Sequence, residues 1–108
     1  MTKGFKGPKG QNQMNMMKQL QQLQQQIETT QAQLAEETVE VTVGGGAVKV
    51  IMTGDQRCQG VEIDPSLLED ADVEMVQDLL LTAFNTALEQ SRDLAAERLG
   101  PLAGGLPI

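Results

Sequence analysis

A long segment without glycine or proline, residues 11–35, constrains the fold of this chain more than any other feature. Ten of its residues are Gln and good helix formers fill most of the rest, so we expect a helix. At 1.5 Å per residue this helix would be about 37 Å long. A chain of 108 residues has room for one ordinary domain, so part of such a helix should project from it.

Apolar residues recur along this segment in alternating steps of four and three. The series is Met16, Leu20, Leu23, Ile27 and Leu34, with Thr30 completing it. This is the a/d pattern of a helix–helix seam, and so narrow a stripe favours contact with another helix over a broad docking face. A coiled-coil brace, within the chain or between chains, would explain the seam without any further function.

Three short segments after this helix predict an antiparallel meander. Residues 37–43 (ETVEVTV), 47–53 (AVKVIMT) and about 57–63 have the length and alternation of strands. The turn signals Gly44–Gly46 and Gly54–Asp55 separate them. A phosphate-binding use of the three glycines would require a helix after the loop, and a strand follows instead, so a hairpin turn is favoured.

Capping signals place a short turn and a second long helix after the strands. In Asp64–Pro65, Asp is a good N-cap and Pro is favoured at the first helical position, which predicts a short turn over 65–68. Asp72 can cap a helix over 73–99, and Gly100–Pro101 should end it. The fold class is therefore α+β, with a long N-terminal helix, a three-stranded antiparallel sheet, a short turn and a long C-terminal helix.

The second long helix carries more apolar surface than one small sheet can cover. Its apolar positions span about 200°, roughly twice what a helix on a three-stranded sheet needs. The most economical partner is a second copy of the chain, as an intertwined or two-fold homodimer. The residues expected at this interface are Val76, Leu80, Ala83, Phe84 and Ala87. Ser91 and Arg98 interrupt the apolar face, so this end of the helix should leave the sheet.

Composition argues against several classes of function. His, Trp and Tyr are absent, and Cys58 is the single cysteine, which we interpret as a small packing residue. Catalytic triads and His-containing zinc sites are excluded, and nothing indicates an enzyme, a cofactor, a metal or a small-molecule substrate. The acids of 69–72 are better explained as solvated caps than as a metal site. The lack of a long apolar run predicts a cytoplasmic protein with no membrane contact.

Charge is divided unevenly along the chain. The net charge of −7 combines +4 over residues 1–27, which contain four lysines and no acid, with −11 over the remainder. An acidic body with a basic end is typical of proteins that touch a polyanion at one end. Solubilising charge near a terminus is the competing explanation, and charge alone favours it.

Several motifs together resemble the YbaB/EbfC family of nucleoid-associated proteins. They are CQGVEIDPSLLED at 58–70, EMVQDLL at 74–80, AFNTAL at 83–88, GGGAVKVIMTG at 44–54 and MKQLQQLQQQI at 17–27. The resemblance implies a small α+β homodimer whose long helices project like tweezers and hold duplex DNA. It also implies a nucleoid-associated protein that alters DNA conformation and contributes to nucleoid organisation and gene regulation.

The resemblance guides the choice of DNA-contacting residues. Phosphate contacts are expected from Lys3, Lys6, Lys9, Lys18 and Arg98, and hydrogen bonds from Asn12, Asn15, Gln19 and Gln22. For Gln19 and Gln22, plain helical surface is an equally good explanation, and Arg92 is expected to pair with Glu89. We expect a mobile basic arm over 1–10, one domain over 11–100 and a loose tail over 101–108. A coiled-coil protein–protein adaptor without DNA binding is the alternative function.

Overall fold

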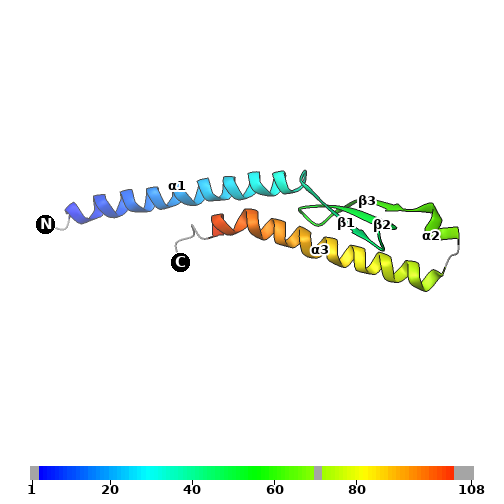
Figure 1. Cartoon of the computed structure of the whole chain (residues 1–108). Helices are drawn as coiled ribbons and strands as arrows, with labels where there is room; N and C mark the ends of the chain where they lie inside the picture. The colour runs from blue at the N-terminus through cyan, green and yellow to red at the C-terminus, as the bar shows by residue number, and fades with distance from the viewer. Residues whose placement is uncertain (1–2, 70–71, 104–108) are drawn as a thin grey trace.

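The computed structural model describes residues 3–69 and 72–103, and their side chains over 13–69 and 72–102. The elements follow the order α1 (Lys3–Leu34), β1 (Thr38–Val43), β2 (Val48–Thr53), β3 (Cys58–Ile63), α2 (Pro65–Glu69) and α3 (Val73–Ala103). Figure 1 shows two long helices joined through a small sheet. The predicted α+β class is confirmed.

The sheet is an antiparallel meander in the order β1-β2-β3. Val41 pairs with Val50, which in turn pairs with Val61, so these three valines lie side by side on one face. The β1–β2 connection has positive φ at Gly44, Gly45 and Gly46, a backbone conformation that glycine adopts without steric cost. The three glycines therefore form the predicted hairpin turn.

Helix α3 covers the valine face of the sheet and forms the core with it. The buried cluster consists of Val41, Val48, Val50, Met52, Ala83 and Ala87. Small alanines at i and i+4 let the helix approach β1 and β2, which are the strands that it contacts most. Strand β3 lies at the edge of the sheet, beyond most of this cover, and Val61 remains 42% exposed.

Two aspartates cap the helices that follow the sheet, as predicted. Asp64 Oδ1 accepts hydrogen bonds from the Ser66 backbone N–H and from the Ser66 hydroxyl, both at 2.9 Å. These bonds stabilise the carboxylate and lower the pKa of Asp64. Asp72 Oδ1 accepts from the backbone N–H groups of Glu74 and Met75 at the start of α3.

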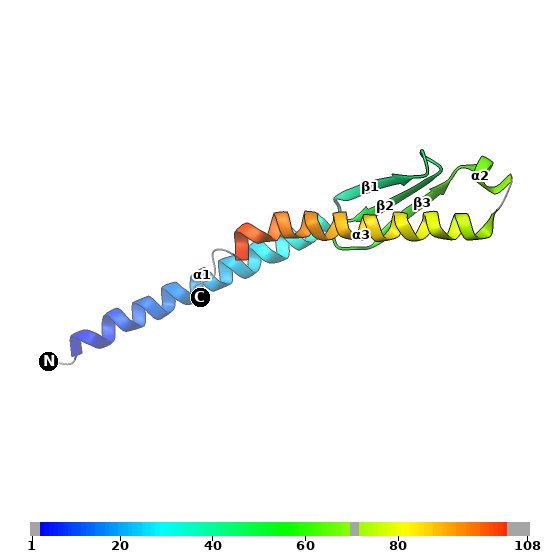
Figure 2. The same ribbon diagram turned by 60° about the horizontal axis from the view of Figure 1, so that its bottom comes forward.

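Helix α1 packs against α3 with its C-terminal half only. Along the predicted seam, Leu34 is buried and Leu23, Ile27 and Thr30 are half-buried, facing the last turns of α3. The N-terminal half continues past the end of α3, as Figure 2 shows. The molecule is therefore elongated, with principal extents of 87 × 20 × 16 Å.

Both long helices extend further than the sequence indicates. Helix α1 begins at Lys3, although we predicted a mobile arm over 1–10, and α3 runs to Ala103 with Pro101 inside it. Once a helix is nucleated, each added residue contributes a hydrogen bond, and a proline near an end sacrifices few of them. Residues 1–2 and most of the predicted tail, 104–108, lie outside the described residues.

The prediction for Cys58 is wrong. Its side chain is exposed rather than packed in the core. A register shift between Ile51 and Met52 places Cys58 opposite Met52 at the edge of the sheet. Edge position and the bulge together keep this side chain in solvent, which the strand pattern alone does not reveal.

Candidate nucleic-acid interface

The projecting half of α1, residues 3–22, is called the arm. Its described side chains include four of the predicted DNA contacts, Asn15, Lys18, Gln19 and Gln22, and all four are exposed. Lys3, Lys6 and Lys9 lie on the helical backbone further out, about 4.5 Å apart along the axis. Asn12 lies between the two groups. The side chains of these four residues lie outside the described part.

The predicted amides belong to a longer series that the sequence reading did not identify. Exposed, uncharged side chains recur in alternating steps of four and three at Asn15, Gln19, Gln22, Gln26, Thr29 and Gln33, which we call the amide stripe. Each member directly precedes a seam residue, so the stripe runs parallel to the seam, about 100° around the helix. The alternating spacing is visible in the sequence and would have identified it.

A shallow groove of about 420 Å³ lies where the amide stripe passes the end of α3. Leu102 lines it from α3, and six residues line it from α1: four members of the stripe, Gln22, Gln26, Thr29 and Gln33, together with Gln25 and Thr30. Amide groups both donate and accept hydrogen bonds, which suits base edges and phosphate oxygens alike. The amide stripe therefore extends the possible contact surface from the arm toward the body.

Arg98, a predicted phosphate contact, forms an ion pair within the chain. Its guanidinium Nη2 donates to Glu37 Oε1 at 2.5 Å, forming an ion pair between α3 and the segment after α1. Sequence reasoning could not find this contact, because the two residues are 61 positions apart. Arg92 is exposed, and the ion pairs found among the described side chains do not include the predicted pair with Glu89.

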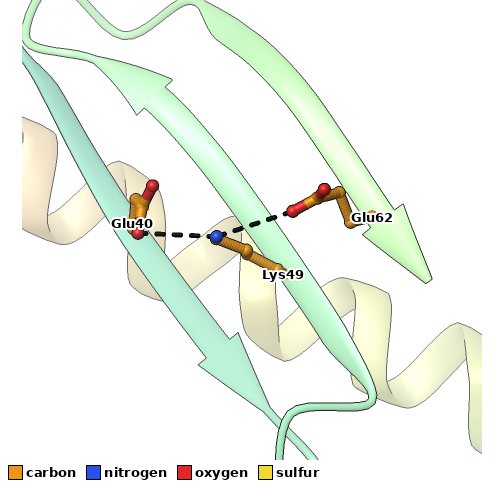
Figure 3. Close-up of polar contacts among 3 residues, drawn as sticks. All are labelled: Glu40, Lys49 and Glu62. Carbon is orange, nitrogen blue, oxygen red and sulfur yellow. Dashed lines mark ion pairs between the residues drawn. The ribbon is translucent and has the colours of Figure 1, made fainter. Parts of the chain in front are cut away.

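The sheet face opposite α3 is unsuited to phosphate. Lys49 lies between Glu40 and Glu62, with its ammonium 3.6 and 3.5 Å from their carboxylates, as Figure 3 shows. Two acids around one lysine leave this group net negative. Lys49 is therefore poorly placed to attract a polyanion.

Part of the predicted dimer interface lies inside the chain's own core. Ala83 and Ala87 are 0% exposed because they form the contact between α3 and the sheet, so an intact protomer cannot offer them to a second copy. Val76, Leu80 and Phe84 are half-buried. The periodicity of α3 identified an apolar face correctly but could not show which part of it the sheet covers.

Apolar side chains also remain exposed on α3 and on β3. Leu79 approaches the β1–β2 turn, where a Cβ on Gly44 would be 3.2 Å from its Cδ2. Leu81 and Phe84 are about 160° and 140° around the helix from Leu79, so they lie on the opposite flank of α3. Leu81 is 62% exposed, and Val61 on β3 is exposed as well.

Two other kinds of site are absent from the described ranges, 3–69 and 72–103. No helix in these ranges has the length and apolar character needed to cross a membrane. Within the same ranges, the acidic and cysteine side chains do not gather in threes as a metal ion would require.

The fold occurs in a protein of known structure. The chain superposes on uncharacterized protein HP0035 from Helicobacter pylori with a TM-score of 0.74, over 82% of this chain and 94% of that one. The sequence identity is 22%, so this likeness establishes the shared α+β fold.

Sequence relatives establish the family. The model of the YbaB/EbfC DNA-binding family matches residues 9–106. A nucleoid-associated protein of Desulforamulus reducens is 49% identical, over 70% of this chain and 72% of that protein. One of Chloroflexus aurantiacus is 47% identical, over 75% of this chain and 81% of that protein. The chain belongs to the YbaB/EbfC family of nucleoid-associated DNA-binding proteins, which is not an enzyme family.

Proposed function

We propose that this protein binds duplex DNA as a homodimer in the cytoplasm, changes the conformation of the DNA, and so contributes to nucleoid organisation and gene regulation. The observation that carries the proposal is the separation of charge in space. Lysines occur on an arm that projects from the body, whereas residues 28–108 carry −11. At physiological salt, charges further apart than about 8 Å are largely screened, so the arm can attract phosphate locally.

The second copy is proposed to cover the apolar flank of α3 and the edge of the sheet. Val61, Leu68 and Leu81 are 42%, 53% and 62% exposed, and Val76, Leu80 and Phe84 lie half-buried on the same helix as Leu81. Burial of such side chains contributes about 25 cal/mol for each Å² removed from water. A dimer formed here leaves the arms outside the interface and brings two of them to one DNA molecule.

The arms are proposed to combine two kinds of contact. Lys3, Lys6, Lys9 and Lys18 contact phosphates, which gives an affinity that depends on salt but little on sequence. Asn12 and the amide stripe donate and accept neutral hydrogen bonds to the DNA. Two arms acting together would clamp the duplex, and a clamp of fixed geometry can bend or stiffen it.

Sedimentation equilibrium and DNA titration test the two parts of this proposal separately. We expect a dimer of the intact chain, converted to monomer by Leu81→Lys, while Lys18→Gln leaves the dimer intact and weakens DNA binding. The chain has no Trp or Tyr, so its concentration must be measured at a peptide-bond wavelength. A monomeric intact chain contradicts the dimer, and absence of duplex binding at low salt contradicts the DNA function.

A protein–protein adaptor remains the second candidate because of one observation on the arm. Met14, Met16, Met17 and Leu20 are between 45% and 62% exposed, and two of them continue the seam beyond α3. Such a stripe fits a partner helix. If Leu20→Lys abolishes capture of one specific protein from nuclease-treated lysate while DNA affinity is unchanged, the adaptor function is supported.

A further inference from the structure

The junction between α1 and the body, which we call the elbow, is residues 35–37 together with Gly54. The Gly54 backbone N–H donates to the carbonyls of Leu34 and Glu37 at 2.8 and 2.9 Å. A Cβ on Gly54 would lie 2.8 Å from Leu34 Cδ2 and 2.9 Å from its carbonyl oxygen, so α1 ends directly against this glycine. The C-terminal end of α1 is therefore fixed to the β2–β3 turn.

Helix α3 is attached to the same turn from the other side. The Ser91 hydroxyl, 0% exposed, donates to the Thr53 carbonyl at 2.7 Å. Ser91 is therefore buried rather than solvent-facing, and its hydroxyl makes its hydrogen bond inside the protein. Two turns further along α3, Arg98 reaches Glu37 of the elbow at 2.5 Å. The Arg98–Glu37 ion pair is the charged contact between α3 and the elbow.

We infer that Arg98 and Glu37 act as a latch that fixes the direction of the arm, and that both are positioning residues for DNA binding although neither contacts DNA. This inference rests on the proposed function for its effect on DNA, but its effect on the arm can be measured without DNA. It assigns a carboxylate of an acidic protein a favourable role in binding a polyanion.

The length of α1 makes the arm sensitive to the elbow. Lys3 lies 31 residues from Leu34, about 46 Å along the axis. A tilt of about 10° at the elbow would therefore displace the outer end of the arm by about 8 Å, which exceeds the spacing between neighbouring phosphates of one strand. Two arms that close on one duplex need matching directions, so a loose elbow lowers affinity without removing any contact.

The decisive variant is Glu37→Gln, because the latch and simple electrostatics predict opposite results. Removing a negative charge should strengthen DNA binding if charge alone matters. The latch predicts binding weakened about two- to fivefold, since each subunit loses an exposed ion pair. Glu36→Gln is the matched control, because this substitution removes the same charge from the neighbouring residue. Glu36 is exposed and forms none of the ion pairs among the described residues.

Arg98 has its own control and its own readout. Arg98→Gln should weaken DNA binding as much as Glu37→Gln does, without changing the slope of log affinity against log salt. The control Arg92→Gln should bind DNA much more like the intact chain. If Arg98 instead bound phosphate directly, the substitution would lower that slope by about one unit for each phosphate that is no longer neutralised. The exchange Glu37→Arg with Arg98→Glu keeps the net charge, and the latch predicts that it restores affinity.

Hydrogen exchange of α1 amides separates the latch from the DNA function. We expect faster exchange over residues 20–34 in Glu37→Gln and Arg98→Gln than in Glu36→Gln, with no DNA present. If the intact chain binds no duplex, the proposed function fails, and exchange still tests the latch. If Glu37→Gln matches Glu36→Gln in both exchange and DNA affinity, or binds more tightly than the intact chain, the latch is wrong.

Discussion

The body and the arm of this protein differ in how far their side chains are buried. In the body, Val48, Val50, Ala83 and Ala87 are 0% exposed, and α3 and two strands enclose them. On the arm, every described side chain is exposed, and polar amides with one lysine accompany the methionines. The body therefore supplies the free energy of folding, and the arm, which contributes little to it, is free to carry binding residues.

This division between body and arm explains how an acidic protein can bind a polyanion. Under the proposed function, stability and affinity for DNA should depend on different residues, and the elbow should influence both. Substitutions in the body should change the free energy of unfolding, those on the arm should change affinity for DNA, and those at the elbow should change both. Four substitutions test this division, in the core, at the elbow, on the amide stripe and at the Asp64 cap. Their expected effects decrease in that order.

The largest effect is expected in the core. Val50→Ala removes buried methyl groups and leaves a cavity, so it should lower the free energy of unfolding by about 2 kcal/mol. Leu20→Ala, at a side chain that is 45% exposed on the arm, should cost less than about 0.5 kcal/mol. Urea denaturation of both variants at one protein concentration checks this. Equal losses would show that the arm is part of the folded core.

The next effect is expected at the elbow. Gly54→Ala forces Leu34 to move, because the new Cβ would approach both its side chain and its carbonyl oxygen, and such overpacking costs about 1–3 kcal/mol. Gly60→Ala is the control, since the nearest atom to its Cβ would be 3.7 Å away. Thermal unfolding and DNA titration should both respond to Gly54→Ala. A change in Tm without a change in affinity would separate the elbow from binding.

A smaller effect is expected on the amide stripe. Gln26→Ala should weaken DNA binding about two- to fivefold, because each subunit loses one neutral hydrogen bond, and should leave the salt slope unchanged. Gln24→Ala lies about 160° around the helix from Gln26 and should have no effect. Fluorescence anisotropy with labelled duplex measures both variants. Equal DNA affinities of Gln26→Ala and Gln24→Ala would show that the amide stripe is ordinary helical surface.

The smallest effect is expected at the Asp64 cap. Hydrogen bonds from Ser66 lower the pKa of Asp64 in the folded protein, so its charge contributes stability above the pKa of the unfolded chain. That contribution is lost as the pH falls through the lowered pKa of Asp64 in the folded protein. Asp64→Asn keeps a hydrogen-bond acceptor without the charge. The difference in Tm between the intact chain and this variant should therefore be largest at neutral pH and shrink in acid. A constant difference would contradict the assignment.

Local features of the fold were predictable because their causes are local. The alternation of Val39, Val41 and Val43, the glycine turn after them and the two aspartate caps each act within a few residues. The ends of the long helices were not predictable from propensity, because Pro101 and the glycines near the start of α1 are tolerated once a helix is established.

The elbow was not predictable because its contacts join distant parts of the chain. Ser91 to Thr53 spans 38 positions, and Arg98 to Glu37 spans 61. In the sequence, Ser91 and Arg98 are polar interruptions of an apolar stripe, which indicated that this end of α3 leaves the sheet. Ser91 is instead buried, and Arg98 forms an ion pair with Glu37 of the elbow. The arm lysines remain predictions from charge and from family resemblance.

The central claim is that the arm binds DNA and the body holds the arm, and one titration tests it most directly. Duplex DNA is titrated with the intact chain and with a variant that carries Gln at Lys3, Lys6, Lys9 and Lys18, at about 50 and 200 mM salt. We expect the intact chain to bind with an affinity that falls steeply with salt. The variant should have the same Tm and dimer mass, bind far more weakly, and depend much less on salt. Equal affinity and equal salt dependence for the two proteins would contradict the account.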